Sequence, residues 1–219
     1  MWTLLKKDLL LEWRAREMLP ALLLLGTLTL VVLSFAFDPM LPWRREAAPG
    51  AFWVALLFAA VYGFGRSFVA EQQNEVLQGL LLAPLDRGTI YLAKATSTLV
   101  YLLAADSVLM ALFVVFFDVP VHQGLWPWVA ATLLASVGLA ALGTLFAAVS
   151  MRTRAREVML PLLLLPLVVP LFLGGVEVTE RCMAGRPLGA ASAWLHLMAG
   201  FDVAAVVVAW LLFEYVVED

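Results

Sequence analysis

Residues 125–150 read LWPWVAATLLASVGLAALGTLFAAVS, and this stretch contains no charged side chain. A helix that crosses roughly 30 Å of hydrocarbon at 1.5 Å per residue needs about 20 apolar residues, so the stretch is long enough to span a membrane. Trp126 and Trp128 stand at its start, where amphipathic rings prefer the level of the lipid headgroups. The stretch therefore predicts a transmembrane helix.

The rest of the chain has the same apolar character. Of its 219 residues, 63% are hydrophobic and 14% are charged. A soluble domain is closer to half apolar and about a quarter charged. A soluble core of this size could not hide that much apolar surface, so lipid is the solvent that fits.

Six apolar stretches predict an all-α integral membrane protein with one transmembrane domain over residues 1–219. The predicted spans are 19–37, 50–69, 91–117, 125–150, 158–176 and 193–213. Residues 2–17 interleave leucines with charged side chains, which favours an amphipathic helix lying in the membrane interface. A cytoplasmic extension of the first span is the alternative, although Pro20 offers a break between the two segments.

The distribution of lysine and arginine predicts the orientation, because cytoplasmic segments carry an excess of both. If the N-terminus is inside, ten fall on the cytoplasmic side: Lys6, Lys7, Arg14, Arg16, Arg66, Arg87, Lys94, Arg152, Arg154 and Arg156. Four fall on the other side: Arg44, Arg45, Arg181 and Arg186. An even number of spans returns the C-terminus to the cytoplasm. No large segment protrudes on either side, so no catalytic domain or catalytic residue is expected.

The longest cytoplasmic connection, residues 71–87, is polar at first, then apolar, and turns at Pro84. Leu77, Leu80 and Leu81 fall on one face of a short amphipathic helix. An exposed apolar stripe needs a partner surface, although the helix could equally lie against its own bundle. The sequence contains no G-x-x-x-x-G-K-[ST] loop, so any work of ATP hydrolysis must come from a partner.

Several motifs follow one another in a characteristic order. They are Lys7-Asp8-Leu9-x-Leu11-Glu12-x-Arg14, Pro49-Gly50-x-x-Trp53-Val54-x-Leu56-Leu57, Arg66-x-Phe68-x-x-Glu71, Leu77-x-x-Leu80-Leu81-x-x-Pro84-Leu85, Leu92-Ala93-Lys94 and Leu165-Pro166-Leu167-x-x-Pro170. In order and spacing they resemble the heme exporter protein B (CcmB) family, the membrane subunit of the cytochrome c maturation ABC transporter. The chain departs from the family at Asn74-Glu75-Val76, where Asp-Gly or similar is usual. It also departs at the tip of the connection between spans two and three, which reads Asp86-Arg87-Gly88.

The resemblance implies an ABC-2-type exporter permease, in which two membrane subunits pair and each docks one ATPase through a coupling helix. By that analogy the coupling residues are Glu71, Leu77, Leu80, Leu81, Pro84, Leu85 and Arg87. The implied partners are a CcmA-like ATPase, a second copy of the chain, CcmC-like and CcmD-like membrane subunits, and membrane lipid, with no nucleic acid. The implied setting is a bacterial plasma (inner) membrane.

The implied activity is export of heme, or release of heme on the outer side, during c-type cytochrome biogenesis. Heme is then a handled ligand and not a tightly bound cofactor. His122 and His196 stand far apart in the sequence, and no C-x-x-C-H motif is present, so neither a heme ligand nor a metal site is expected. An ABC-2 permease for another cargo such as a lipid or drug, a proton-driven secondary transporter, and an assembly factor without cargo are the alternatives.

Asp106 and Asp202 lie near the middle of spans three and six. A carboxylate at bilayer depth costs several kcal/mol unless it is paired, protonated or hydrated, so each acid is a functional candidate. The alternative is a neutral acid hydrogen-bonded to a neighbouring helix or to its own backbone. Ser107, Thr96 and Thr98, on the same span as Asp106, are nearby polar side chains.

Three further features concern how the spans join and pack. Arg66 and Glu71 could form an ion pair at the joint between span two and the coupling segment. Pro161, Pro166 and Pro170 remove donors from span five, which predicts a kinked span that packs inward, either as a flexible gate or as a fixed kink. The small residues of span four predict a close helix neighbour, from the same subunit or from a second copy.

Overall fold

The computed structural model describes Lys6, Leu10 and residues 18–37, 43–73, 86–119, 125–150, 156–186 and 189–218. Within these ranges, the structure describes the backbone but not the side chains of residues 65–73, 156–157, 190 and 217–218. The described residues form the helices α2 (Met18–Ala36), α3 (Arg44–Gln73), α5 (Arg87–Phe117), α6 (Trp126–Ser150), α7 (Arg156–Met183) and α8 (Gly189–Glu218), with no strand among them. All six are long and apolar enough to cross a membrane. The prediction of an all-α membrane protein with six spans is confirmed, whereas the interfacial helix at 2–17 lies outside the described residues except for Lys6 and Leu10, which are helical.

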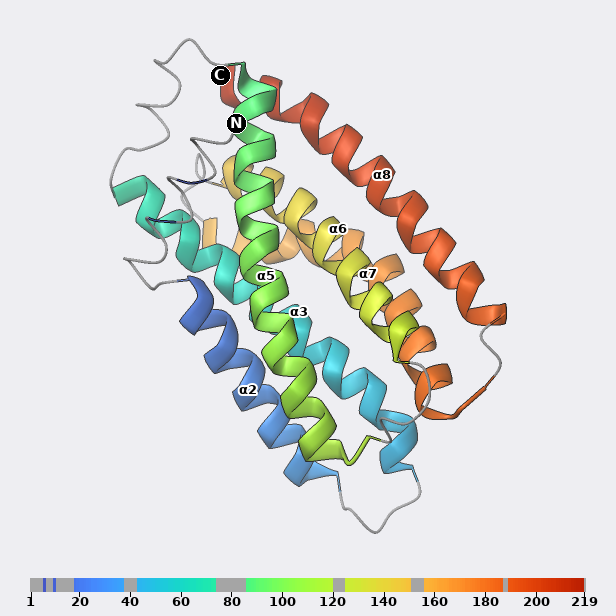
Figure 1. Ribbon diagram of the computed structural model, residues 1–219. Coiled ribbons are helices and arrows are strands. Elements are labelled where there is room, and N and C mark those ends of the chain that lie inside the picture. Colours follow the sequence, from blue (N-terminus) through green and yellow to red (C-terminus); the bar gives the residue numbers. More distant parts are fainter. Residues whose placement is uncertain are drawn as a thin grey trace.

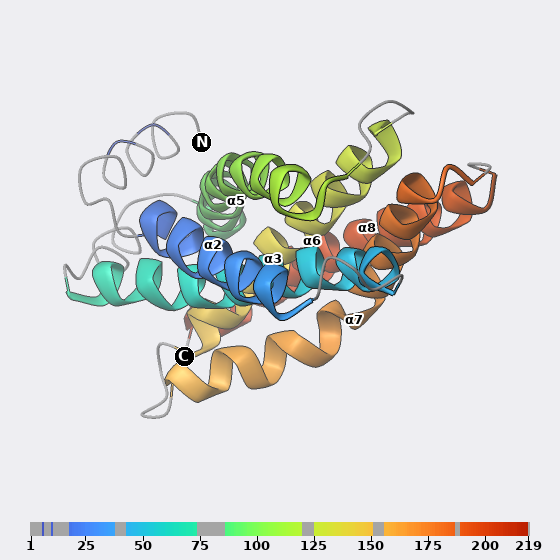
Figure 2. The ribbon, with the colours of Figure 1, turned by 90° about the horizontal axis from the view of Figure 1, so that it is seen from below.

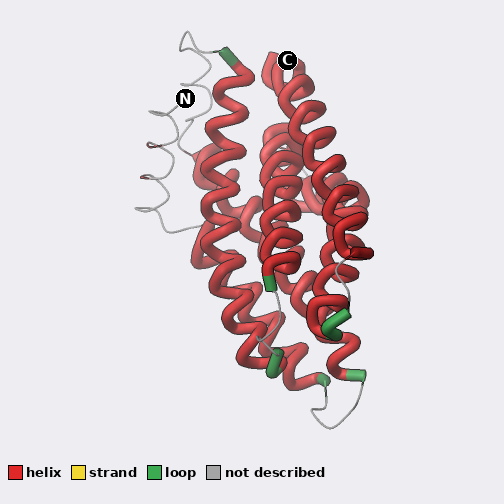
Figure 3. Tube along the Cα trace, turned by 45° about the vertical axis from the view of Figure 1, so that its right-hand side comes forward, coloured by secondary structure: helices red, strands yellow, loops and turns green. Residues whose placement is uncertain are grey.

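The helices run alternately up and down in one elongated bundle (Figures 1 and 3). At one end, called here the Arg87 end, α3, α6 and α8 finish and α2, α5 and α7 begin (Figure 1). At the opposite end, called the Arg186 end, α2, α5 and α7 finish. The end of α3 and the start of α5, which flank residues 74–85, therefore lie at the same end of the bundle as the end of α8.

The central helix is α6, which packs against α5, α7 and α8 and buries most of its length (Figure 2). Its glycines form notches for large neighbours. A Cβ on Gly138 would stand 2.4 Å from Leu171 Cδ1 of α7, and one on Gly143 would stand 2.3 Å from Phe64 Cζ of α3. The sequence left open which subunit supplies the close neighbours of this helix, and at these notches they come from the same chain.

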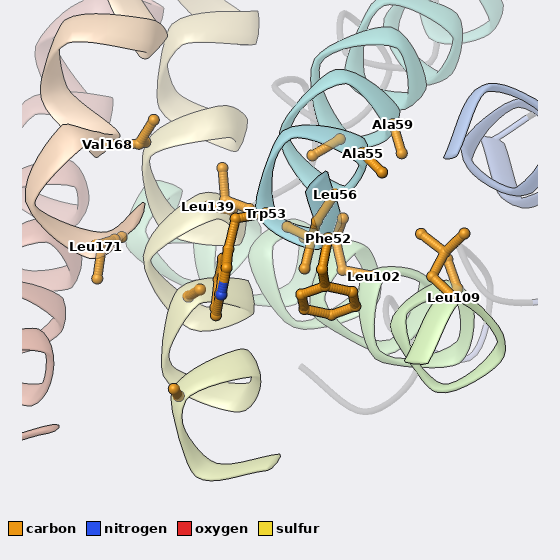
Figure 4. Packing of buried hydrophobic residues seen from close by; sticks show 14 of the residues in the cluster. Phe52, Trp53, Ala55, Leu56, Ala59, Leu102, Leu109, Leu139, Val168 and Leu171 are labelled. Carbon is orange, nitrogen blue, oxygen red and sulfur yellow. The ribbon is translucent and has the colours of Figure 1, made fainter. Parts of the chain in front are cut away.

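Aromatic rings fill the half of the bundle nearer the Arg186 end. Phe52 and Trp53 of α3 stack edge to face, and Phe52 also contacts Phe113 of α5 and Trp128 of α6, with ring centroids 5.2 Å apart in both cases. Trp53 continues the series to Phe172 of α7 at 5.5 Å. Figure 4 shows Trp53 reaching from α3 toward α6 and α7. These rings hold four helices together without any covalent link.

Four helices, α3, α5, α7 and α8, extend several residues beyond the predicted spans. Helix α3 begins at Arg44 and includes Pro49, although the span was predicted from residue 50. Helix α7 continues past residue 176 to Met183, where Arg181 pairs with Glu177 one turn earlier at 3.1 Å. The turn that follows has a left-handed Gly185, with φ 62°, a conformation that favours glycine. Helices can continue beyond the hydrocarbon, so these ends leave the predicted span limits untested.

Helix α7 runs unbroken through Pro161, Pro166 and Pro170. Its buried stripe includes Leu164, Val168 and Leu171, whereas Pro166 is exposed on the opposite side. One stripe of α7 therefore packs against the bundle, and Pro166 lies outside that stripe. A gating or kinking role for the three prolines remains a prediction.

Candidate functional site

The two intramembrane acids lie on opposite sides of α6. Asp106 of α5 and Asp202 of α8 are each 4% exposed. Asp106 contacts Ser136, and Asp202 Oδ1 lies 2.6 Å from the position that a Cβ on Gly138 would take. Ser136 and Gly138 differ by about 200° around the axis of α6 and by about 3 Å along it. The two carboxyls therefore flank the central helix at nearly the same depth.

Asp106 has a hydrogen-bond partner on α6. The Ser136 hydroxyl lies 2.6 Å from Asp106 Oδ2 and 2.7 Å from the carbonyl oxygen of Thr132. A hydroxyl has a single hydrogen, so Ser136 donates it to the Asp106 carboxyl or to the Thr132 carbonyl, or shares it between the two. This is the paired, structural alternative that the sequence allowed for an intramembrane acid.

Two polar residues on the same helix as Asp106 form hydrogen bonds elsewhere. Ser107 donates to the carbonyl of Leu103, and Thr96 donates to that of Leu92, each within α5. Sequence reasoning missed Ser136 as the partner, because thirty residues separate it from Asp106. The run of small residues in span four marked a close approach but did not show which hydroxyl would face an acid.

Asp202 is in the opposite situation. Neither of its carboxyl oxygens has a hydrogen-bond partner among the residues that the structure describes. Its carboxyl faces Gly138 of α6, and Leu171 of α7 lies against the same glycine. Neither residue has a side chain that could donate a hydrogen bond. The structural alternative required a partner, so Asp202 is the stronger functional candidate of the two acids.

The first turn of α5 carries several polar contacts. Asp86 caps the helix and accepts a hydrogen bond from the Thr89 backbone N–H at 3.1 Å. Arg87 Nη1 donates to the carbonyl oxygen of Glu214 on α8 at 3.4 Å. Tyr91 donates through its hydroxyl to the Ala141 carbonyl of α6 at 3.1 Å. The start of α5 is thus attached to two other helices.

Most of the predicted coupling residues, Leu77, Leu80, Leu81, Pro84 and Leu85, lie outside the described residues. The two ends of the segment are described, because α3 continues through Gln73 and α5 begins at Arg87.

Arg66 and Glu71 both belong to α3, which is continuous there. Positions five apart on one helix fall on different faces, unlike positions three or four apart. That spacing gives no support to an ion pair between them while the helix is unbroken.

At the Arg186 end, Arg44 caps another helix. Its Nη2 donates to the Phe116 carbonyl near the finish of α5 at 2.8 Å, and its guanidinium lies 5.4 Å from the centroid of the Phe117 ring. A cation at a helix C-terminus is favourable because of the helix dipole. Sequence reasoning counted Arg44 only as a charge on the outer side.

The histidines show no metal site in the part of the chain that is described. His196 is exposed on α8, and His122 falls outside the described residues. No group of three or more His, Cys, Asp or Glu side chains gathers within the described ranges.

Comparison with known proteins gives a consistent result. Residues 1–218 match the family described as CcmB protein. A heme exporter protein B from Rhodobacter capsulatus is 30% identical over 211 residues, which cover 94% of this chain and 93% of that protein. One from Paracoccus denitrificans is 31% identical over 84% of each chain, and one from Haemophilus influenzae is 28% identical over 89% of this chain and 88% of the relative.

Proposed function

The chain belongs to the CcmB family, and on that premise we propose that it is the membrane permease subunit of an ATP-driven ABC transporter that acts in c-type cytochrome biogenesis. The observation that carries the proposal is the family match over residues 1–218, together with six helices long enough to span a membrane. The similar proteins are named heme exporters, so heme is the cargo, or the ligand released on the outer side.

The chain works with partners and catalyses no reaction itself. It contains no P-loop motif, so a separate CcmA-like ATPase supplies the free energy. A second copy of the chain and CcmC-like and CcmD-like subunits complete the assembly. The complex lies in the bacterial inner membrane with both termini cytoplasmic, which is the orientation that the lysine and arginine distribution favours.

The ATPase docks on the segment between α3 and α5, at the Arg87 end. Leu77, Leu80 and Leu81 provide the apolar contacts of this docking segment, which also includes Pro84 and Leu85, and Glu71 and Arg87 lie at the polar rim. Apolar side chains at the centre of an interface carry most of its binding energy, whereas rim charges contribute little. Movement of the docked ATPase then tilts α3 and α5, as in other packed-helix transitions.

Co-purification with the ATPase tests the docking segment. Leu80→Asp and Leu81→Asp place a charge in the apolar interface and should weaken recovery of the ATPase with the tagged membrane subunit. Asn74→Asp, in the polar first part of the same segment, is the matched control and should leave recovery unchanged. Full recovery with both leucine variants would show that the ATPase binds elsewhere.

ATP hydrolysis by the purified chain alone would refute the proposed division of labour. So would formation of c-type cytochromes in cells that lack the ATPase. Both measurements use the complete chain and need no knowledge of the docking surface.

The unpartnered carboxyl of Asp202 favours one alternative, a proton-driven secondary transporter. Replacing Asp106 and Asp202 by asparagine separates the two functions. An ATP-driven permease should retain most of its cytochrome c assembly in the double variant. Loss of this activity, with the variant still assembled with its ATPase, would favour proton coupling through the acids.

A further inference from the structure

We propose that the start of α5 and the finish of α8 form a rigid joint that carries movement of the coupling segment into α8. The α5–α8 joint consists of Arg87, Gly88 and Tyr91 on α5 with Trp210, Phe213 and Glu214 on α8. This inference rests on the proposed function, because it assumes that an ATPase moves the segment that ends at Arg87. The proposal implies that α8, the helix most distant in sequence from the coupling segment, moves together with α5.

The closest contact of the joint is between Gly88 and the indole of Trp210. A Cβ on Gly88 would stand 2.2 Å from Trp210 Nε1 and 3.0 Å from Trp210 Cε2. Heavy atoms cannot approach so closely without bonding, so any larger residue at position 88 displaces the ring or the helix. Glycine lies in the first turn of α5, where its weak helix propensity is of little cost, and here it gives the indole direct access to the backbone.

The positive charge of Arg87 stabilises the end of α8 and not the start of its own helix, α5. A cation in the first turn of α5 is unfavourable for α5, because the N-terminus of a helix carries a partial positive charge. The same guanidinium donates to the Glu214 carbonyl in the last turns of α8, where the helix dipole favours a cation. Its position is therefore explained by the contact between the helices and not by the stability of α5.

A separate apolar cluster surrounds these contacts. Its fully buried members come only from α5, α6 and α8, and they are Ile90, Tyr91, Leu145, Ala148, Ala209 and Phe213. The rings of Tyr91 and Phe213 lie 5.3 Å apart. The larger core, which contains the buried hydrophobic residues from α2, α3 and α7, forms a different cluster. At the Arg87 end, α5 and α8 are thus packed to each other and to α6 in a second cluster, which Phe146 of α6 links to the main core.

The consequence follows from where the coupling segment ends. Its last residue before the joint is Asp86, whose side chain caps α5, so no flexible spacer separates the segment from Arg87. Packed interfaces move as units because their side chains interlock. A displacement at Asp86 is therefore transmitted to Trp210 and Glu214, and along α8 toward Asp202.

The test measures whether ATP moves α8 through the joint. Spin labels replace the exposed Leu162 of α7, a helix that the coupling segment does not adjoin, and the exposed Leu197 of α8 in a chain whose native Cys182 is changed to serine, and the chain is purified with its ATPase. ATP should change the distance between the labels in the parent. Trp210→Ala should remove most of that change and lower the yield of c-type cytochrome about tenfold. Trp126→Ala, which removes an exposed indole at the other end of the bundle, is the matched control and should do neither.

A cross-link distinguishes transmission from simple loss of packing. Gly88→Cys with Trp210→Cys should behave like Trp210→Ala when reduced, and a short thiol cross-linker should restore the ATP-dependent change. A cross-linked complex that binds ATP but no longer moves would show that α5 and α8 must separate, which overturns the joint. Normal movement in Trp210→Ala would overturn it as well. If the parent chain recovers no ATPase, the proposed function itself has failed, and the role of the joint falls with it.

Discussion

At the scale of single residues, the same side chain meets two different surroundings. Asp106 faces a serine hydroxyl 2.6 Å away, whereas Asp202 faces a glycine. A buried polar group without a partner costs more than a satisfied one contributes, so the two acids differ in what their removal does. The hydrogen bond of Asp106 joins α5 to α6. Asp202 forms no such bond between helices among the described residues.

The bond between Asp106 and Ser136 gives a prediction for stability. Ser136→Ala leaves the carboxyl without its partner and should lower the free energy of unfolding by about 0.5–2 kcal/mol, the range found for hydrogen bonds between membrane helices. Ser107→Ala is the matched control, since that hydroxyl bonds only its own helix, and should change stability less. Denaturant unfolding in detergent or bicelles measures both, and equal losses would contradict the assignment.

At the scale of the elements, glycines decide how closely the helices approach. Gly175 of α7 admits the Trp53 ring of α3, whose Cζ2 would lie 2.3 Å from a Cβ at that position. Trp53 is also fixed by a 2.9 Å hydrogen bond from its Nε1 to Thr179 Oγ1, one turn further along α7. The indole is therefore held at both its ring and its nitrogen and has no space to move aside.

Gly175→Ala should therefore destabilise the contact between α3 and α7. Overpacking of a well-packed core costs about 1–3 kcal/mol, which exceeds the gain of about 0.5–1 kcal/mol from better helix propensity. Gly200→Ala is the control, because nothing lies within 4 Å of a Cβ there, and this variant should be neutral or slightly more stable. Thermal unfolding, with Trp fluorescence as the probe, should rank the two variants in this order, and the reverse order would contradict the tight packing.

At the scale of the whole molecule, the alternation of six helices places the finish of α8 beside the start of α5. The Arg186 end carries arginines paired with acids, such as Arg181 with Glu177 and Arg186 with Glu180. The cytoplasmic side is predicted from the sequence, by the ten lysines and arginines counted there against four on the other side.

The orientation can be measured with single cysteines. In a chain with Cys182→Ser, a membrane-impermeant maleimide should label Arg186→Cys in intact spheroplasts, because the lysine and arginine distribution predicts that the Arg186 end faces outward. Glu214→Cys should react only after the membrane is opened. Both positions are exposed in the bundle, so accessibility to the reagent depends on the side of the membrane. The opposite labelling pattern would invert the proposed topology and place the docking segment outside.

The sequence by itself determined the membrane class, the six spans and the family, because each depends on local information. Runs of about 20 apolar residues predict spans one at a time, and short motifs in a fixed order identify a family. The predicted span limits, the interfacial helix and the coupling residues remain predictions, since they concern segment ends or residues that the structure does not describe.

Only the tertiary structure decided which residues meet. Ser136 rather than Ser107 faces Asp106, Asp202 lacks a partner among the described residues, and Trp210 lies on Gly88. The apolar pattern of a membrane helix does not predict these contacts. Positions that face lipid and positions that face protein are both apolar, so the periodicity of hydrophobic residues does not distinguish one face of the helix from the other. Which face of each helix turns inward is fixed by small residues and ring shapes that fit across helices, and that fit exists only after the chain has folded.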